Sequence, residues 1–479
     1  MTKSKGLILL TLTLAILFAT WLYWRQRPGP VRPAARPSVS NSLDGTWSLA
    51  KAAQPFRGQT IRLIGEDYPP LQAIARLKAE FEAETGIKVE IEGYEAETVL
   101  EKVALDLASG ASRYDLIIQI YFDMGRLANQ GQIQPVRQFL ENKKLRDPGF
   151  NPEKDLFPVW HTMAWYDDEP YGFPMMVLTM YTWYRKDLFE SPLEKAQFKN
   201  RYGYDLGPPA DWDQYRDIAE FFTRPSDGLY GTLIQGKRHI ALWQEYLNFL
   251  YSFGGEILDT DNPSRYGPIA INSPAAVKAT TYYKGLKKFS PPDTLNFTWD
   301  DALALMQQGK VAMCLMWNDS TYALEDPQQS KVAGKMGYSL VPRGAAGIVQ
   351  QIGGQSYYIP RASKRPEAAY LFMQWMMRKD VQIRQQKLGG SSARRSTYSD
   401  PEVLALPWTK TNIAALDSPH PAMLFTFPES LQIGETIKAS ISEALVGSRE
   451  VPEVLDEAAL EMRRLLADKA DLLYPPVRK

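Results

Sequence analysis

Between residues 60 and 120 the sequence alternates regularly between strand-like and helix-like segments, and this alternation restricts the possible folds more than any other feature. Residues 61–64 form a short apolar strand, and residues 71–81 repeat apolar side chains at helical spacing. Residues 87–92 then alternate between apolar and polar side chains, as a half-buried strand does. After a second helical segment, residues 114–120 read as a third strand. This order with short connections predicts a doubly wound α/β layer.

A second group of elements follows this layer. An apolar run at residues 175–180 continues into an aromatic stretch at residues 181–184, which predicts a strand that leaves the first layer and enters another. Later, Gly353 and Gly354 begin a strand-like stretch that looks like a return crossing, because paired glycines permit the unusual backbone angles of a hinge. A plain turn is the alternative explanation of the glycine pair. Two amphipathic helices are expected within residues 435–466.

The first 24 residues predict a membrane segment. Two lysines precede an uncharged stretch from Gly6 to Trp24, which as a helix would nearly cross the hydrocarbon core of a membrane. This segment is either a secretory signal or an uncleaved anchor. The bulky residues that follow Thr20 fit a cleavage site poorly, which favours the anchor. Residues 25–57 are rich in proline and serine, and they predict an extended tether.

The composition argues against several classes of protein. Lysine plus arginine and aspartate plus glutamate both number 55, so the formal net charge is zero and there is no basic footprint for nucleic acid. The 3 histidines lie far apart and only 1 cysteine occurs, so neither a metal site nor a cofactor is expected. The common enzyme signatures, GxSxG, the phosphate loop, GxGxxG and HExxH, are missing. A glycosidase stays possible, because its two carboxylates need no motif.

Aromatic side chains beside polar groups point to a sugar-like ligand. The chain has 12 tryptophans and 25 tyrosines. The apolar run at residues 311–316 ends at Trp317, which Asn318 and Asp319 follow at once, and open parallel sheets bind ligands beyond the carboxyl ends of their strands. An indole ring can cover the C–H face of a sugar while amides and carboxylates bind its hydroxyls. The alternative is that Trp317 is a core residue beneath a loop.

Eight short segments occur in a recognisable order, at residues 60–65, 81–89, 114–118, 131–136, 171–174, 184–189, 309–313 and 353–360. In this order they resemble the extracellular solute-binding proteins (family 1) of ABC importers, in the carbohydrate-binding group that includes maltose-binding protein. Each segment alone is a weak signal, but together they extend the resemblance from about residue 58 to residue 470.

The resemblance implies an α/β, two-lobed periplasmic-binding-protein fold of type II, here with an N-terminal transmembrane helix. The implied organisation is a membrane helix at 1–24, a tether at 25–57, a first lobe of residues 58–176 and 354–398, and a second lobe of residues 177–353 and 399–475.

The resemblance also implies where a ligand binds. The implied ligand-binding residues are Glu66, Asp67, Tyr68, Gln119, Tyr121, Asp123, Trp243, Trp317, Asp319 and Gln355. Trp317 falls on the family's stacking tryptophan, so its ring is expected to form a platform at the cleft. Leu178 is apolar where the family's maltose binder offers a carboxylate, so a maltodextrin is not implied. No catalytic, metal-binding or cofactor-binding residue is implied.

The function that the resemblance implies is that of a receptor and not an enzyme. It would capture a sugar or sugar-like solute outside the cytoplasm, close two hinged lobes around it, and deliver it to the transmembrane subunits of an ABC permease. The predicted location is periplasmic, with the N-terminal helix holding the protein to the cytoplasmic membrane. One alternative is a tethered binding module that presents a ligand to a sensor or an envelope assembly, and a carboxylate glycosidase is another.

Overall fold

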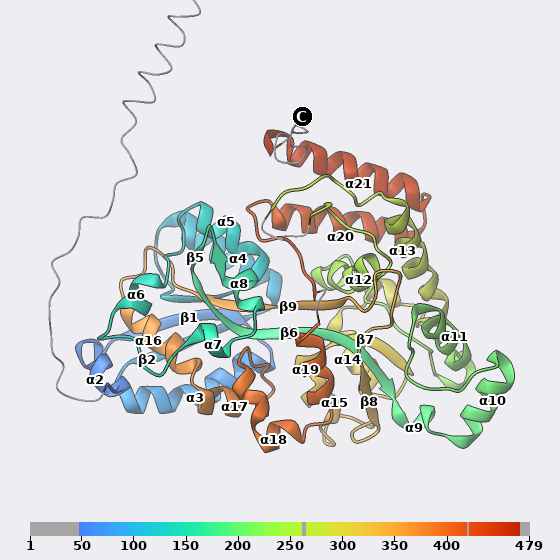
Figure 1. Cartoon of the computed structure of the whole chain (residues 1–479), viewed down its shortest axis with the longest axis horizontal. Helices are drawn as coiled ribbons and strands as arrows, with labels where there is room; N and C mark the ends of the chain where they lie inside the picture. Colours follow the sequence, from blue (N-terminus) through green and yellow to red (C-terminus); the bar gives the residue numbers. More distant parts are fainter. Residues whose placement is uncertain (1–46, 261–264, 419–420, 470–479) are drawn as a thin grey trace, which may run out of the picture. The chain divides into compact units, whose positions relative to one another are not determined.

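The computed structural model describes residues 47–260, 265–418 and 421–469 (Figure 1). Its centre is an eight-stranded sheet with the order β2-β1-β3-β9-β6-β7, in which β10 pairs with β9 and β8 pairs with β6. The strands are β1 (Thr60–Glu66), β2 (Lys88–Tyr94), β3 (Leu116–Ile120), β6 (Gly172–Arg185), β7 (Met313–Trp317), β8 (Met336–Ser339), β9 (Gln350–Tyr358) and β10 (Pro421–Ala422), with a separate hairpin of β4 (Trp165–Tyr166) and β5 (Glu169–Pro170).

Many helices surround this sheet. They are α2 (Leu49–Ala53), α3 (Pro69–Thr85), α4 (Ala96–Ser109), α5 (Met124–Asn129), α6 (Arg137–Glu141), α7 (Pro152–Asp155), α8 (Val159–Ala164), α9 (Lys186–Phe189), α10 (Pro192–Tyr202), α11 (Trp212–Phe222), α12 (Ile240–Ser252), α13 (Pro274–Gly285), α14 (Trp299–Gln307), α15 (Thr321–Glu325), α16 (Pro366–Met376), α17 (Lys379–Lys387), α18 (Pro401–Leu404), α19 (Thr409–Leu416), α20 (Ser430–Val446) and α21 (Val451–Leu465).

Strands β1, β2 and β3 form the parallel layer that the alternating sequence predicts. Strand β1 pairs in parallel with β2 on one side and with β3 on the other. Helices α3 and α4 lie on opposite sides of these strands in Figure 1, as right-handed crossovers in this strand order require. Helix α3 ends where Gly86 adopts a φ of 72°, a left-handed conformation that glycine reaches without strain. The predicted doubly wound layer is therefore confirmed.

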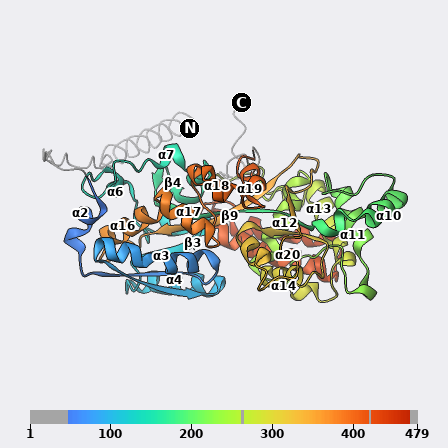
Figure 2. The ribbon, with the colours of Figure 1, turned by 90° about the horizontal axis from the view of Figure 1, so that it is seen from below.

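The long strands β6 and β9 connect two halves of the described chain. The first part of β6 pairs with β9, and its last part, from Met180 to Arg185, pairs with β7 and β8. We call the part built around β1, β2 and β3 the first lobe, and the part built around β7, β8 and α12 the second lobe. In Figure 2, α3, α4 and α16 of the first lobe and α11, α12 and α13 of the second lobe lie at opposite ends of the view. One continuous sheet thus passes through both lobes.

The paired glycines predicted as a hinge lie inside strand β9. The alternative of a plain turn is therefore wrong, since Gly353 pairs with Leu178 and Gly354 pairs with Val177. Gly354 has a φ of 137°, and a Cβ atom there would lie 2.4 Å from the carbonyl oxygen of Met176. Only glycine fits this position, because any side chain would collide with the neighbouring strand.

The second lobe is built around helix α12, which is buried along most of its length and packs on α13 and α20. The apolar run predicted as a strand is β7, all of whose residues are buried. The single cysteine, Cys314, lies in it with a fully buried thiol, as expected of a small core residue. The two predicted C-terminal helices are α20 and α21, and they pack on each other.

The N-terminal prediction is corrected in part. Residues 47–57 are not an extended tether: Leu49–Ala53 form helix α2, which packs on α3 and α16 because Leu49 and Ala53 are buried against the first lobe. The predicted membrane helix at 1–24 and the tether from residue 25 to residue 46 lie outside the described residues. No helix in the described part of the chain combines the length and the apolar composition that a membrane span needs.

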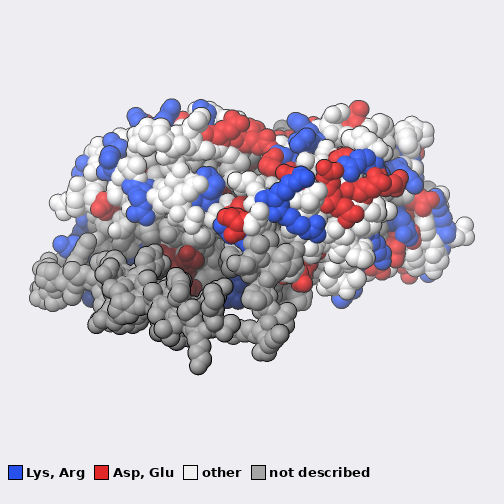
Figure 3. All heavy atoms as spheres, turned by 90° about the horizontal axis from the view of Figure 1, so that it is seen from above, with Lys and Arg blue, Asp and Glu red and all other residues white. Residues whose placement is uncertain are grey.

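Charged side chains are mixed on the face shown in Figure 3. Lysine and arginine lie among aspartate and glutamate there, and neither sign covers this face continuously. This distribution agrees with the zero formal net charge, and it gives no basic surface on this face for nucleic acid.

Candidate functional site

A cleft of about 670 Å³ lies between the two lobes. The first lobe contributes residues that follow β1 and β2, and the second lobe contributes residues at the starts of α12 and α14 and at the end of β7. Strand β9 contributes Gly354 and Gln355 at the floor. Because β1 and β2 run in parallel, the residues after both strands meet at the same edge of the sheet, where open α/β sheets bind ligands.

Three side chains at the floor of the cleft form a hydrogen-bonded chain. The Nε2 amide of Gln355 donates to a carboxylate oxygen of Glu66 at 2.6 Å, and the hydroxyl of Tyr68 donates to Oε1 of Gln355 at 3.1 Å. Glu66 and Tyr68 come from the end of β1, whereas Gln355 comes from the crossing strand β9. This chain therefore links the binding surface of the first lobe to the strand that passes into the second.

Two carboxyl groups at the floor have raised pKa values. Burial, followed by the negative charge of Asp319, raises the pKa of Glu66 to about 8. Burial also raises the pKa of Asp319 to about 6, although the backbone N–H of Ser320 donates to this carboxylate at 2.9 Å. The charge of Asp319 thus disfavours the ionisation of Glu66, and the charge of Asp300 disfavours that of Asp319.

Trp317 lies at the cleft and in the core at the same time. Its side chain lines the cleft but is only 5% exposed, and it belongs to the large hydrophobic core. A Cβ atom on Gly353 would lie 2.9 Å from the indole ring, so the ring packs directly on the glycine backbone of β9. The two interpretations that the sequence left open, a residue at the cleft and a residue of the core, are therefore compatible.

The structure brings six of the ten predicted binding residues to the cleft. They are Glu66, Asp67, Tyr68, Trp317, Asp319 and Gln355. All six lie within a strand of the central sheet or within two residues of its end, at positions that the resemblance to the family implied.

The other four predicted residues do not line the cleft. Gln119 is buried on β3, and its neighbour Ile120 faces the cleft instead, because side chains of a strand alternate between its two sides. Tyr121 accepts a hydrogen bond from the backbone N–H of Leu424 at 2.6 Å. The two remaining residues have partners elsewhere.

Asp123 and Trp243 are occupied by contacts away from the cleft. Asp123 is buried and forms an ion pair with Arg126 at 2.7 Å. The ring of Trp243 packs edge to face on Phe122, with 5.2 Å between the ring centroids, and it also contacts Gly434. Both residues stabilise the interior of the protein.

The sequence did not reveal that the N-termini of three helices form part of the cleft wall. Glu95, His239 and Thr298 are the N-cap residues of α4, α12 and α14, and all three line the cleft. Gln244, Trp299 and Asp300 of the second lobe line it as well. The threonine and Asp301 of the third N-cap form a capping box, a signal readable in the sequence as Thr-x-x-Asp.

Two polar contacts cross the cleft from lobe to lobe. Nε2 of His239 lies 3.4 Å from a carboxylate oxygen of Glu95, and Nζ of Lys438 on α20 lies 3.3 Å from a carboxylate oxygen of Glu97 on α4. Burial opposes the ionisation of Glu95, but backbone N–H groups and His239 prevail and lower its pKa. These contacts hold the helices of the two lobes against each other at the cleft.

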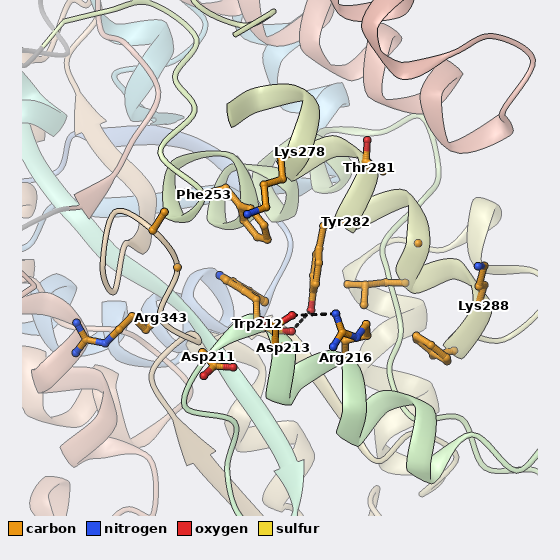
Figure 4. A pocket seen from close by; sticks show the side chains of 15 residues that line it. Asp211, Trp212, Asp213, Arg216, Phe253, Lys278, Thr281, Tyr282, Lys288 and Arg343 are labelled. Atoms are coloured by element: carbon orange, nitrogen blue, oxygen red, sulfur yellow. Dashed lines mark hydrogen bonds and ion pairs between the residues drawn. The ribbon is translucent and has the colours of Figure 1, made fainter. Parts of the chain in front are cut away.

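A second cavity, of about 700 Å³, lies entirely within the second lobe (Figure 4). Aromatic rings of Trp212, Phe253 and Tyr282 form much of its wall, and Arg216 at its edge pairs with Asp213 at 2.9 Å. This cavity receives no residue from the ends of β1, β2 or β7, and it contains no residue of the first lobe. The cleft between the lobes is therefore the candidate ligand site.

Metal binding finds no support in the described residues. Among residues 47–260, 265–418 and 421–469, no group of three or more histidine, cysteine, aspartate or glutamate side chains is arranged to hold a metal ion.

Comparison with known proteins places the chain among binding proteins. The chain is 24% identical over 89% of its length to the mannitol-binding protein of Pseudomonas aeruginosa, of which it covers 99%. It is 24% identical over 78% of its length to a probable amino-acid ABC transporter periplasmic-binding protein of Sinorhizobium fredii, of which it covers 81%. Among solved structures, an ABC transporter solute-binding protein of Agrobacterium radiobacter in complex with ribitol matches with a TM-score of 0.76 and 25% identity, over 85% of this chain and 99% of that one.

The family itself follows from a match over most of the chain. Residues 65–383 match the family model described as bacterial extracellular solute-binding protein. This match includes the end of β1, the crossing strands β6 and β9, β7 and most of the residues that line the cleft. The chain therefore belongs to the bacterial extracellular solute-binding proteins, with their two-lobed α/β fold, and it is a solute-binding receptor of an ABC transporter.

Proposed function

We propose that this receptor captures a polyol or a sugar between its lobes and delivers it to a membrane permease. The observation that carries the proposal is the composition of the cleft, which is lined by the carboxyl groups of Glu66 and Asp319, the amides of Gln244 and Gln355 and the ring of Trp317. Relatives named for mannitol and ribitol support the same class of solute. Carboxylates and amides suit neighbouring hydroxyls, and an indole ring suits a C–H face.

Capture depends on both lobes. A solute bound to Glu66 and Tyr68 of the first lobe gains further contacts with Gln244 and Asp319 of the second only when the lobes come together. The solute thus stabilises the closed arrangement through contacts that the open one lacks. The permease would recognise this closed arrangement.

The lobe boundaries and the membrane anchor belong to the same proposal. The proposed first lobe consists of residues 58–176 and 354–398, and the second lobe of residues 177–353 and 399–475. The pairing of Val177 with Gly354 supports these boundaries, because it makes two of the proposed crossing points neighbours in the sheet.

The uncharged stretch 6–24 supports an uncleaved anchor to the cytoplasmic membrane. Alkaline extraction of membranes tests the anchor, because a cleaved protein is released.

Isothermal titration with a panel of linear polyols and monosaccharides tests the function. At least one member, with mannitol and ribitol as the first choices, is expected to bind one to one with a dissociation constant of about 10 μM or tighter, which corresponds to roughly −7 kcal/mol. The same solute should raise the melting temperature in proportion to the logarithm of its concentration. Failure of every polyol and sugar to bind would overturn the proposal.

Binding without catalysis is part of the proposal. Two carboxyl groups with separated pKa values would also suit a glycosidase, but the relatives and the family are binding proteins. Incubation with chromogenic glycosides is expected to release no product. Release that disappears in an Asp319→Asn variant would establish the glycosidase instead.

Replacing His239 with alanine is expected to weaken solute binding about three- to tenfold, the equivalent of roughly 1 kcal/mol for an exposed ion pair. The reason is that the contact of His239 with Glu95 joins the two lobes, so its loss disfavours closure. Titration of the variant with the best solute of the panel measures the effect. A matched control is His161→Ala, because His161 pairs with Glu153 within the first lobe, outside the cleft, and its loss should leave affinity unchanged.

A further inference from the structure

The cleft floor carries two carboxyl groups that no cationic side chain of the described residues neutralises. Glu66 accepts a hydrogen bond from Gln355, and Asp319 accepts from the backbone N–H and the hydroxyl of Ser320. No lysine, arginine or histidine in the described part of the chain forms an ion pair with either. Two carboxyl groups without a cationic partner in a confined site resist ionisation, and a positive partner between them would allow both to ionise.

Some other carboxylates of the first lobe have a cationic partner. Asp123 pairs with Arg126 at 2.7 Å, and Asp155 pairs with Arg394. Not every carboxylate away from the cleft has one, since the buried Asp106 and Glu245 are held by hydrogen bonds instead. Glu66 and Asp319 differ from those two because they line the cleft, where a cation carried by the solute can reach them.

The walls of the cleft favour a cation as well. Its lining includes the carboxyl groups of Glu66, Asp67, Glu95, Glu97, Asp300 and Asp319, of which Glu95 contacts His239 and Glu97 pairs with Lys438. The other fixed positive charges in the lining are Lys237 and Arg238, and both are exposed. The rings of Trp299 and Trp317 line the same space, and the faces of aromatic rings attract cations. An excess of negative charge in the cleft raises the local concentration of positively charged solutes.

Gln244 shows that the solute must also carry hydroxyl-like groups. Its side chain is only 9% exposed and lines the cleft, yet neither its amide nitrogen nor its oxygen forms a hydrogen bond with any described residue. A carboxamide has both donors and an acceptor to satisfy, and a hydroxyl group serves either. The polar atoms of Gln244 are open to the cleft and are therefore available to the hydroxyl groups of a bound solute.

We infer that the solute is a polyhydroxylated amine, an amino sugar or an aminopolyol, whose ammonium group lies between Glu66 and Asp319 and whose hydroxyls reach Gln244. This inference rests on the proposed function and narrows its solute class. The ammonium group donates to both carboxylates at the floor, and the rings of Trp299 and Trp317 line the same space.

Matched pairs of solutes test the inference by isothermal titration of the protein at pH 7. Each pair differs only in the amine: D-glucosamine against D-glucose, and 1-amino-1-deoxy-D-glucitol against D-glucitol, with N-acetyl-D-glucosamine as a neutral amide. The amine of at least one pair is expected to bind tenfold or more tightly than its neutral partner, and acetylation should remove the gain. The preference should shrink when the salt concentration is raised, since it is electrostatic.

Two variants distinguish the ammonium site from general binding. Glu66→Gln with Asp319→Asn should abolish the preference for the amine, whereas Glu245→Gln, which changes a buried carboxyl group outside the cleft, should retain it. A neutral partner that binds equally well or better in every pair would overturn this inference and leave the proposed function standing. Absence of binding by amines and by neutral polyols and sugars alike would overturn both.

Discussion

Replacing Glu66 with glutamine is expected to weaken solute binding by roughly 10- to 100-fold and, at pH 8, to stabilise the unliganded protein. The loss of affinity follows because a hydrogen bond to a charged group contributes about 1.5–3 kcal/mol. The gain in stability follows because burial and Asp319 make the ionised carboxylate of Glu66 unfavourable in the folded protein. A residue with a purely structural role would not show these opposite signs.

The pH dependence gives the sign of the stability effect. The pKa of Glu66 is raised to about 8 in the folded protein from an ordinary value of 4.5, so between these pH values the folded chain keeps a proton that the unfolded chain has released. The free energy of unfolding therefore falls as the pH rises through this window. Urea unfolding at pH 5 and pH 8 should show that Glu66→Gln removes on the order of 2 kcal/mol of this fall.

Glu245 provides a matched control for this experiment. Its carboxyl group is buried on α12 away from the cleft and accepts from the hydroxyl of Tyr283 and the backbone N–H of Gln235, and burial raises its pKa to about 7. Glu245→Gln should therefore also reduce the pH dependence of stability, while solute affinity stays unchanged. If Glu66→Gln binds as tightly as the unmodified protein, Glu66 has no part in recognition.

The first lobe was predictable because its signals are local. Apolar periods that switch between strand and helix, with glycines at the helix ends, identify β1, α3, β2, α4 and β3 within one stretch of sequence. The polar residues that follow β7, such as Asp319, were found for a similar reason, since the carboxyl end of a strand can be read from where an apolar run stops. Glu66 at the end of β1 was instead implied by the resemblance to the family.

The wall formed by the second lobe was not predictable in this way. Helix α12 is buried almost all round, so its sequence has no polar stripe to show which side faces the cleft. Adjacent residues consequently separate, with Trp243 in the core and Gln244 at the cleft. The same limit applied to Gln119 and Ile120, where a difference of one residue on a strand decides the side.

The hinge and the binding surface share their residues. Gly353 lies against the ring of Trp317, and only glycine fits at position 354. Gln355 donates a hydrogen bond to Glu66. Three successive residues of β9 therefore take part both in the strand that crosses between the lobes and in the binding surface. A solute that binds Glu66 and Trp317 therefore acts on the strand that passes between the lobes. This coupling gives a direct physical route from binding to closure.

Replacing Trp317 with alanine is expected to cost about 3–5 kcal/mol of unfolding free energy and to reduce solute binding by more than tenfold. The first effect follows because the ring is 5% exposed and fills space against Gly353, and the second because the same ring lines the cleft. Urea unfolding measures the stability, and titration at a temperature where the variant is folded measures the affinity.

Trp243→Ala separates the two roles of a buried indole. Trp243 is as buried as Trp317 and packs on Phe122, but it does not line the cleft. Its replacement should therefore cost a similar free energy of unfolding while the folded variant keeps its affinity for the solute. Equal losses of affinity in both variants would mean that Trp317 acts only through the core. A loss of affinity that is confined to Trp317→Ala, and that Trp317→Phe partly restores, would establish the ring as the surface on which the solute lies.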